Sequence, residues 1–335
     1  QNILKDAGLT GFELSGVEPN PKIETVRKGV EICKNEGIDM VLAIGGGSTI
    51  DCSKVVAAGA KYDGDAWDLV LDGSKVKAAL PIFDVLTLSA TGTEMDPFAV
   101  ISDMSKNEKW GTGSPYMVPT MSILNPEYTF SVSKKQTAAG TADMMSHTME
   151  NYFSMENADC QKFMDEGLLR SMMKNGPAAL AQPDNYEARA NLMWAGTHAI
   201  NGVVGDGCSP AWCVHPMEHE LSAFYDITHG EGLAILTPAW MEHILNDDTL
   251  PMFVEFAKNV WGLSGDDDYA LAHAGIDALK KFFFETMGIP ANLRAVGITD
   301  DRNFEVMAKK ACEGSKGSFV PLSKDDIVEI YRAAF

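Results

Sequence analysis

The chain has 335 residues, of which 45% are hydrophobic and 22% charged, values typical of a globular protein with two domains of roughly 130 to 200 residues each. Its 47 acidic residues outnumber 27 basic ones, and the net charge of −20 argues against a nucleic acid or an anionic membrane as partner. No apolar run approaches the ~20 residues of a membrane span, and no signal-peptide pattern opens the chain, so we expect a soluble, cytoplasmic protein.

The first part of the chain alternates between strand and helix patterns. Residues 12–17 alternate apolar and polar side chains and end at the turn sequence EPNP, which predicts a strand. Residues 23–35 have apolar side chains at helical spacing, followed by Gly37, which predicts the helix of a βαβ crossover. The wholly apolar run 40–44 predicts a parallel strand covered on both faces.

A glycine turn connects this strand to the next helix. Gly45, Gly46 and Gly47 precede Ser48 and Thr49, either of which is a good N-cap. In such a turn the free N–H groups and the positive end of the helix hold a phosphate. Three glycines also suit an ordinary tight turn, but the position between a buried strand and a helix favours phosphate binding.

Further strands are predicted at 81–88, 98–102 and 121–124, and a loop is predicted at 62–73. The strand at 81–88 leads into 89–94, which is rich in small hydroxyl residues. The carboxyl edge of an open α/β sheet is where ligands bind, although the same hydroxyl residues also form turns.

From residue 133 onward the patterns favour helices. These are predicted at 134–153, 159–174, 185–200, 217–224, 230–244 and 252–261. We therefore expect a Rossmann-like α/β domain with a parallel sheet over 1–132 and an all-α domain over 133–335. The active site is expected in the cleft between the two domains.

The helical half contains a group of metal-binding residue types. Asp143 and His147 are four residues apart, as are His215 and His219, so each pair lies on one face of a helix. With His229, these residues offer one carboxylate and four imidazoles, a combination that suits zinc or ferrous iron. The isolated His198, His243 and His273 are expected at the surface or in the core.

Five donors are one more than a tetrahedral metal needs. Asp143, His147, His215 and His229 would fix one divalent metal, and a substrate oxygen would bind when the coordination number expands. His219 would then hydrogen-bond the substrate or the cofactor and pass a proton, a task that suits an imidazole titrating near neutrality. Alternatively, His219 packs against the cleft wall, or it is a ligand and another donor is the spare one.

A phosphate turn that faces a metal site indicates hydride transfer. The metal would act as a Lewis acid on an alcohol or carbonyl oxygen, and a nicotinamide would accept or give the hydride. The same donors could instead activate water in a hydrolase or a lyase, although no cluster of arginine or lysine surrounds the motifs to bind an anionic substrate. A non-catalytic metal-binding remnant is the third alternative.

Four motifs, GGGSTIDCSK, LTLSATGTE, TADMMSHTMENYF and HPMEHELSAFYDITHG, resemble the iron-containing, group III alcohol dehydrogenase family. They are especially similar to its clostridial-type NAD(P)H-dependent butanol dehydrogenases and aldehyde reductases, and the likeness runs over almost the whole chain. The resemblance implies that Asp143, His147, His215 and His229 are metal ligands and that His219 is a non-ligand beside the nicotinamide. The positions that it implies around the cofactor are Gly46, Gly47, Ser48, Asp51, Thr87, Thr91, Lys109 and Tyr128.

The resemblance also implies NAD(P)H together with one Fe²⁺ or Zn²⁺, a small primary alcohol or aldehyde as substrate, and a homodimer. This chain opens at Gln1, in what reads as the end of a helix, whereas family members begin with a further segment. That segment supplies the first strand of the sheet and a glycine turn near the adenosine ribose. The chain is therefore expected to be a truncated form with an open sheet edge, and the choice between NADH and NADPH stays open.

Overall fold

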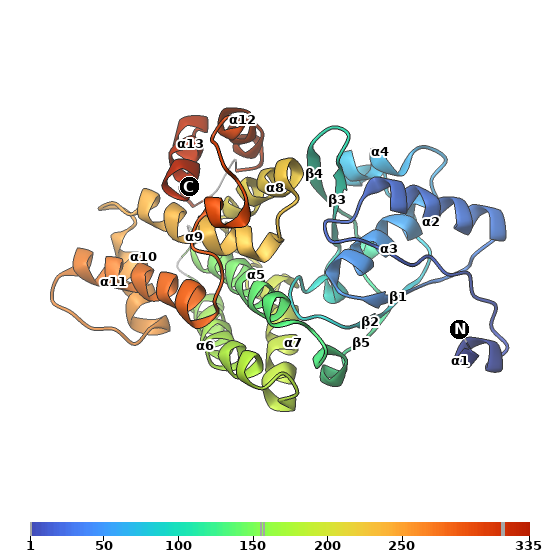
Figure 1. The fold of residues 1–335 in the computed structure, drawn as a ribbon, viewed down its shortest axis with the longest axis horizontal. Coiled ribbons are helices and arrows are strands. Elements are labelled where there is room, and N and C mark those ends of the chain that lie inside the picture. The colour runs from blue at the N-terminus through green and yellow to red at the C-terminus, as the bar shows by residue number, and fades with distance from the viewer. Residues whose placement is uncertain (1, 155, 157, 316–318) are drawn as a thin grey trace.

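The computed structural model describes residues 2–154, 156, 158–315 and 319–335. Two parts of the chain lie side by side in it: an N-terminal part that contains the strands and a C-terminal part made of helices (Figure 1). The predicted fold class, an α/β part with a parallel sheet followed by an all-α part, is confirmed. The boundary predicted at 132/133 falls beside Ser133, the N-cap of the first long helix, and as a domain limit it stays a prediction.

A three-stranded parallel sheet organises the N-terminal part. Its strands are β1 (Val41–Gly45), β2 (Ile82–Leu86) and β5 (Met121–Ile123), in the order β1-β2-β5. The helices of this part are α1 (Asn2–Asp6), α2 (Ile23–Glu36), α3 (Gly47–Gly59) and α4 (Ala66–Leu71). The strands predicted at 40–44, 81–88 and 121–124 and the helix predicted at 23–35 are therefore present. Gln1, read as part of a helix end, lies outside the described residues.

The strand predicted at 98–102 belongs to a separate hairpin. β3 (Phe98–Asp103) pairs antiparallel with β4 (Glu108–Gly113), and in the described structure neither strand joins the parallel sheet. Lys54 of α3 anchors this hairpin, because its buried Nζ donates to the carbonyl of Phe98 in β3 and to the carboxylate of Asp96 just before it, both at 2.8 Å. A contact between residues 42 positions apart leaves no local sequence pattern.

Two other predictions in this part are wrong. Residues 12–17 form no strand, because no neighbouring strand among the described residues pairs with them, and Phe12 is exposed. The loop predicted at 62–73 contains α4, which begins after Asp65. The carboxylate of Asp65 accepts a hydrogen bond from the backbone N–H of Trp67 at 3.1 Å, and the Trp67 side chain is buried, so capping and burial stabilise this short helix.

Only one face of the parallel sheet is covered by the described residues. Ala43 of β1 and Leu86 of β2 pack with Ile50 of α3 in a small core. On the opposite face, Ile44 of β1 is 63% exposed and Met121 of β5 is 62% exposed. The prediction that 40–44 is covered on both faces is therefore wrong for this part of the chain, and β1 forms one edge of the sheet.

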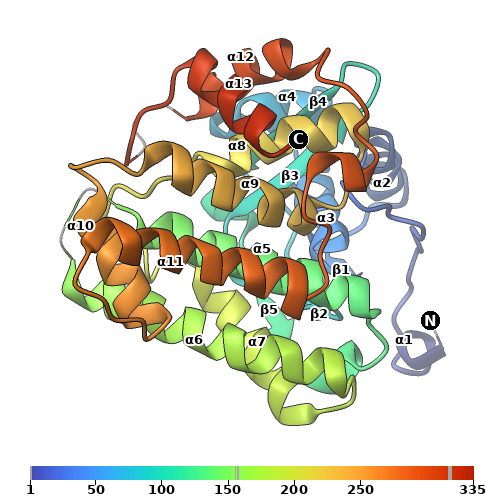
Figure 2. The same ribbon diagram turned by 60° about the vertical axis from the view of Figure 1, so that its left-hand side comes forward.

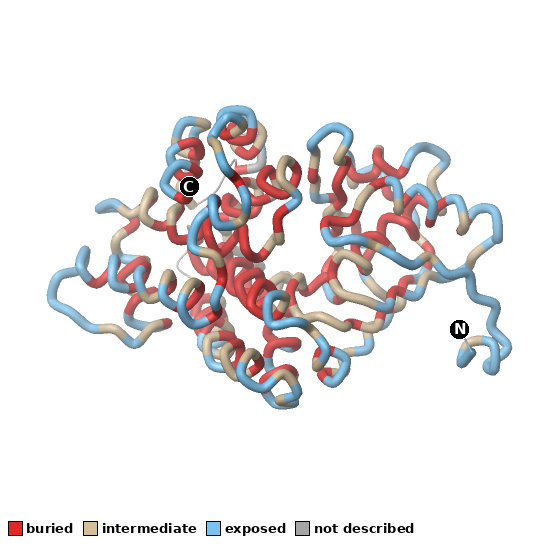
Figure 3. The backbone as a smooth tube through the Cα atoms, viewed as in Figure 1, coloured by how far each residue is buried: buried red, intermediate tan, exposed pale blue. Residues whose placement is uncertain are grey.

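The C-terminal part packs around α5 (Lys134–Tyr152), which Figure 3 shows as almost continuously buried and Figure 2 shows running through the centre of the helices. The remaining α-helices of this part are α6 (Asp159–Ala181), α7 (Tyr186–Ile200), α8 (Val214–Tyr225), α9 (His229–Ile244), α10 (Leu250–Glu255), α11 (Asp268–Lys281), α12 (Phe304–Gly314) and α13 (Lys324–Ala333). Short 3₁₀ or π segments lie at Gly73–Lys75, Thr93–Met95, Pro115–Met117, Pro126–Thr129, Phe256–Val260, Phe282–Thr286 and Leu293–Val296. All six predicted helices are present.

Tertiary packing extends α6 beyond its predicted end at Lys174. The helix continues through Pro177, although Asn-Gly-Pro is a stop signal in the sequence. A Cβ atom at Gly176 would lie 2.9 Å from Cγ2 of Thr141, so α6 lies close against α5 at this glycine. None of the helices in the described part of the chain combines the length and the hydropathy that crossing a bilayer requires.

Candidate active site

A cavity of about 1170 Å³ lies between the two parts of the chain. Its wall on the N-terminal side includes Gly46, Gly47, Ser48, Asp51, Thr91 and Lys109, and its wall on the helical side includes Asp143, His147, His215, His219 and His229. Two predicted cofactor residues do not line it. Thr87 follows β2, where its backbone N–H donates to the carbonyl of Gly45 at 2.9 Å, and Tyr128 is 48% exposed in the segment Pro126–Thr129.

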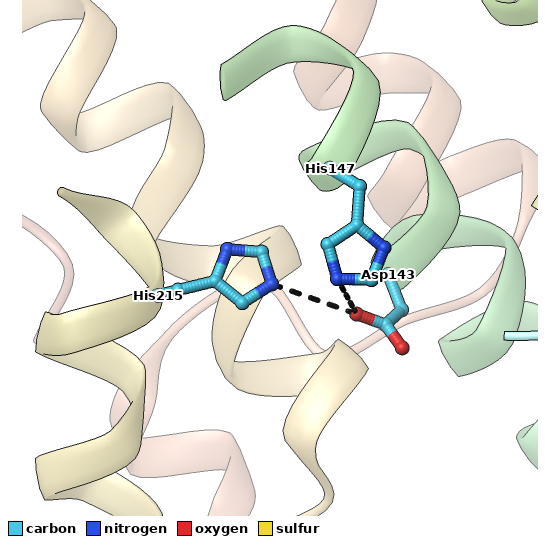
Figure 4. A group of neighbouring side chains, drawn as sticks. All are labelled: Asp143, His147 and His215. Atoms are coloured by element: carbon cyan, nitrogen blue, oxygen red, sulfur yellow. Dashed lines mark ion pairs between the residues drawn. The ribbon is translucent and has the colours of Figure 1, made fainter. Parts of the chain in front are cut away.

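Three helices bring the predicted metal ligands together. Asp143 and His147 lie on α5, His215 lies in the first turn of α8, and His229 is the first residue of α9. The Oδ1 atom of Asp143 lies 3.5 Å from Nε2 of His147, 3.8 Å from Nε2 of His215 and 3.7 Å from Nε2 of His229. Figure 4 shows one ring nitrogen of His147 and one of His215 directed toward the same oxygen of the Asp143 carboxylate.

The arrangement of these donors fits a divalent cation. Oδ1 of Asp143 and Nε2 of His215 are buried and have no hydrogen-bond partner among the described residues, a costly state unless another group satisfies them. The rings of His147 and His215 are stacked, with their centroids 4.7 Å apart. Their ligand atoms and that of Asp143 all lie within 4.8 Å of one another. One carboxylate with imidazoles suits zinc or ferrous iron.

Two buried glutamates orient the histidines, and our sequence analysis did not single them out. The Nδ1–H of His215 donates to Oε1 of Glu150, and the Nδ1–H of His229 donates to Oε2 of Glu218. A carboxylate can only accept, so the neutral form of each ring is held as the tautomer whose Nε2 lone pair faces Asp143. Helical spacing was the available signal, because Glu150 lies three residues after His147 and Glu218 lies three residues after His215.

The charges of the group follow from burial and from these partners. Burial favours the neutral form of Asp143, but the nearby imidazoles outweigh it and hold the pKa of the carboxyl well below its usual range. Burial lowers the pKa of His147 to about 3, so this ring is neutral. For His215, burial is outweighed by Glu150 and Asp143, which raise the pKa to about 9, so a metal would have to displace a proton from this ring.

His219 faces the same cavity one helical turn after His215. Its ring centroid lies 5.6 Å from that of His229 and 6.3 Å from that of His215. Burial and the positive charge of Lys109 hold the pKa of His219 well below its ordinary value. A lowered pKa favours the neutral ring, and the role expected for His219 as a proton relay stays a prediction.

The glycine turn has the predicted place at the end of β1, with a different N-cap. Gly46, in an extended conformation, is the N-cap of α3, and its carbonyl accepts from the N–H groups of Thr49 and Ile50 at 3.0 and 3.2 Å. Neither Ser48 nor Thr49 is the cap, because the helix has already begun at Gly47. A side chain at Gly47 would collide with Thr91, so the turn packs closely against the loop after β2.

Asp51 supports the cavity wall as well as lining it. Its carboxylate accepts from Oγ1 of Thr93 at 2.6 Å and from the backbone N–H of Val100 at 2.9 Å. It therefore ties α3 to the loop after β2 and to β3. Burial raises the pKa of Asp51 despite the nearby charge of Lys54.

Trp212 is a further wall residue that our sequence analysis did not single out. Its ring centroid lies 5.1 Å from that of His215 and 5.9 Å from that of His147, and it lines the cavity. The backbone of Trp212 has a φ of 34°, which is uncommon for a bulky residue. Tertiary contacts alone place this indole beside the two imidazoles, so no local motif indicated it.

A nucleotide-type turn and a group of metal donors on the two walls of one cavity define a metal-dependent oxidoreductase of the α/β plus all-α class. The chain belongs to the iron-containing alcohol dehydrogenase family. The sequence model described as "Iron-containing alcohol dehydrogenase" matches residues 1–126, and the one described as "Fe-containing alcohol dehydrogenase family, C-terminal" matches residues 137–335. The family uses NAD(P)H and a divalent metal. The predicted family membership is confirmed.

Characterised relatives match nearly the whole chain. It is 55% identical to NADH-dependent butanol dehydrogenase A of Clostridium acetobutylicum, in an alignment covering 99% of this chain and 86% of the relative. It is 36% identical to the NADPH-dependent aldehyde reductase YqhD of Escherichia coli, over 90% of this chain and 79% of the relative. The crystal structure of NADH-dependent butanol dehydrogenase A from Thermotoga maritima matches with a TM-score of 0.94 at 39% identity, covering 99% of this chain and 85% of that one.

Proposed function

We propose that the chain interconverts a small primary alcohol, such as butanol, and its aldehyde with NAD(P)H, and that Asp143, His147, His215 and His229 hold one Fe²⁺ or Zn²⁺. The main support is the approach of three imidazole Nε2 atoms to one buried carboxylate oxygen, at 3.5 to 3.8 Å, in the wall of a cavity that reaches the glycine turn. The names of the relatives support the substrate class and the nicotinamide.

The protein residues have distinct tasks in this proposal. When bound, the metal supplies Lewis acidity at the substrate oxygen, and the nicotinamide supplies or accepts the hydride. Asp143 and the three histidines hold the metal at the helical wall, while Glu150 and Glu218 keep two of the rings in the required tautomer. The N–H groups at the start of α3, which lines the same cavity, would bind the pyrophosphate of the cofactor.

His219 and Trp212 shape the space beside the metal ligands. The neutral ring of His219 can accept a hydrogen bond from the substrate hydroxyl or from a ribose hydroxyl. Trp212 covers the rings of His147 and His215 from the cavity side, where it excludes water and offers an apolar surface to the alkyl chain of the substrate.

We place this activity in the cytoplasm and in a homodimer. The absence of a membrane-spanning helix among the described residues is consistent with the location, and the family resemblance supports the assembly. Sedimentation of the purified chain would show the oligomeric state.

Oxidation of reduced cofactor tests the proposed reaction. The purified chain, loaded in turn with Fe²⁺ and Zn²⁺, is expected to consume NADH or NADPH when butanal is added, with equimolar formation of butanol. Consumption that needs the metal but not the aldehyde would contradict the proposed reaction. Metal-dependent hydrolysis or elimination without oxidation of the cofactor would favour the hydrolase or lyase alternative.

The glycine turn can be tested by binding alone. Gly46→Val places a side chain where the backbone approaches the pyrophosphate, and its Cβ would already lie 3.2 Å from Cβ of Leu88. Losing one charge-assisted hydrogen bond costs about 1.5 to 3 kcal/mol, so cofactor affinity should fall by at least ~tenfold while metal content stays unchanged. Gly167→Val is the control, because its Cβ would meet nothing within 4 Å. Unchanged affinity in Gly46→Val would mean that the segment is an ordinary turn.

A further inference from the structure

Glu218 lies where the two walls of the cavity meet. It is fully buried on α8, between His215 and His219 in the sequence. Its Oε2 atom accepts from the Nδ1–H of His229 on the helical side and lies 3.2 Å from Nζ of Lys109 on β4. One carboxylate oxygen therefore contacts a candidate metal ligand and a residue of the opposite wall.

The contact with Lys109 crosses between the two parts of the chain. Lys109 is 4% exposed, and among the described residues Glu218 is the only acidic side chain that pairs with its ammonium group. The Nζ atom also lies 3.3 Å from Nδ1 of His229. Nζ of Lys109 and Nδ1 of His229 each carry a proton that needs an acceptor. Both lie beside Oε2 of Glu218, so the two donors share this oxygen.

We propose that Glu218 is a positioning residue that couples the metal side of the cavity to its cofactor side, so that occupancy of one site raises affinity at the other. This inference rests on the proposed function, which places the metal at His229 and the cofactor beside Lys109. A cation at Nε2 of His229 polarises the ring and strengthens the bond from Nδ1–H to Glu218. The shared oxygen then holds Lys109 less tightly, and the ammonium group turns toward the cavity that it lines.

The direction of the coupling follows from charge. The cofactor brings an anionic pyrophosphate into the cavity, and a lysine released toward the cavity favours it. Coupling between two binding free energies is reciprocal. A bound cofactor that draws Lys109 away from Glu218 therefore strengthens the hydrogen bond from His229 to Glu218 and raises the affinity for the metal. Metal should therefore strengthen cofactor binding, and the cofactor should strengthen metal binding by the same factor.

Glu150 provides a matched control. It holds the other oriented histidine, His215, in the same way, and its second oxygen accepts from the backbone N–H of Val214 at 3.0 Å. Both partners belong to the helical part, so Glu150 supports a metal ligand without reaching the opposite wall. A change of Glu150 should weaken the metal site and leave the coupling intact.

The experiment measures NADH binding by fluorescence to the chelated chain and to the zinc-saturated chain, for the wild type, Glu218→Gln and Glu150→Gln. In the wild type, zinc should lower the Kd of NADH at least ~fivefold. Both variants should bind zinc about 10- to 100-fold more weakly. For each variant we compare the Kd of NADH for the chelated chain with the Kd for the zinc-saturated chain. The ratio of the first to the second should fall toward one in Glu218→Gln and should keep its wild-type value in Glu150→Gln.

Several outcomes would overturn the coupling: a wild-type ratio near one, an unchanged ratio in Glu218→Gln, or an equal loss of the ratio in both variants. A wild type that binds neither zinc nor NADH would contradict the proposed function itself, which distinguishes the two failures. Circular dichroism checks that the variants fold. If Glu218→Gln does not fold, Lys109→Met breaks the same contact from the other wall and must also bring the ratio toward one.

Discussion

Replacing His215 by Ala is expected to remove most of the bound metal and to lower kcat/KM at least ~10³-fold. The metal is expected to stabilise the transition state by several kcal/mol, and each 1.4 kcal/mol is a factor of ten in rate. His215 is buried in the first turn of α8, and its Nε2 has no partner among the described residues, so the substitution removes one of the proposed donors from the buried group. Metal analysis per chain and steady-state kinetics provide the two measurements.

His273→Ala is the control for this substitution. His273 is half-exposed, pairs with Glu242 at 2.9 Å and does not line the cavity, so both metal content and turnover should be unchanged. A His215→Ala variant with full metal occupancy would show that the proposed ligand set is wrong. The donor set suits iron and zinc alike, and the metal analysis of the wild type decides between them.

Replacing His219 by Ala is expected to leave metal content at the wild-type level and to lower kcat by about 10²- to 10⁴-fold, the usual contribution of a positioned acid or base. Its ring lies in the cavity wall beside the proposed ligands, and burial together with the charge of Lys109 keeps it neutral. A neutral imidazole can accept a hydrogen bond from an alcohol hydroxyl and orient it, and Ala cannot. Metal analysis, kcat and KM are measured on the same preparation.

The alternatives for His219 predict different results. Full metal with unchanged turnover would mean that the ring only packs against the wall, and lost metal would mean that it is a ligand. His219→Asn separates hydrogen bonding from proton transfer, because the amide keeps a hydrogen-bonding group at similar reach but does not act as a base at neutral pH. Turnover in His219→Asn should therefore lie between those of the wild type and His219→Ala.

Local features of the fold could be predicted from the sequence because their causes are local. The parallel strands β1, β2 and β5 and the helix α2 follow from apolar runs, helical spacing and glycine stops. The helical character of the second part follows in the same way. Residues 12–17 show the limit of this reasoning, because a strand needs a partner strand, and side-chain alternation does not supply one.

The sequence by itself determined which donors of the candidate site share a helix face. Asp143 with His147, and His215 with His219, are paired by a spacing of four residues, which any α-helix converts into proximity. The strand, glycine turn and helix at Gly46 are likewise contiguous in the chain. These relations depend on backbone geometry over a few residues, so they can be predicted directly from the spacing of residues in the sequence.

Only the tertiary structure decided how these pieces meet. Lys109 and His229 contact the same oxygen of Glu218, and the indole of Trp212 lies beside His147. These contacts, and the low pKa of His219, depend on groups that are far apart in the chain. Lys109 and Glu218 are 109 positions apart. Electrostatic and packing energies depend on distance in space and on burial, and neither quantity follows from local spacing in the sequence.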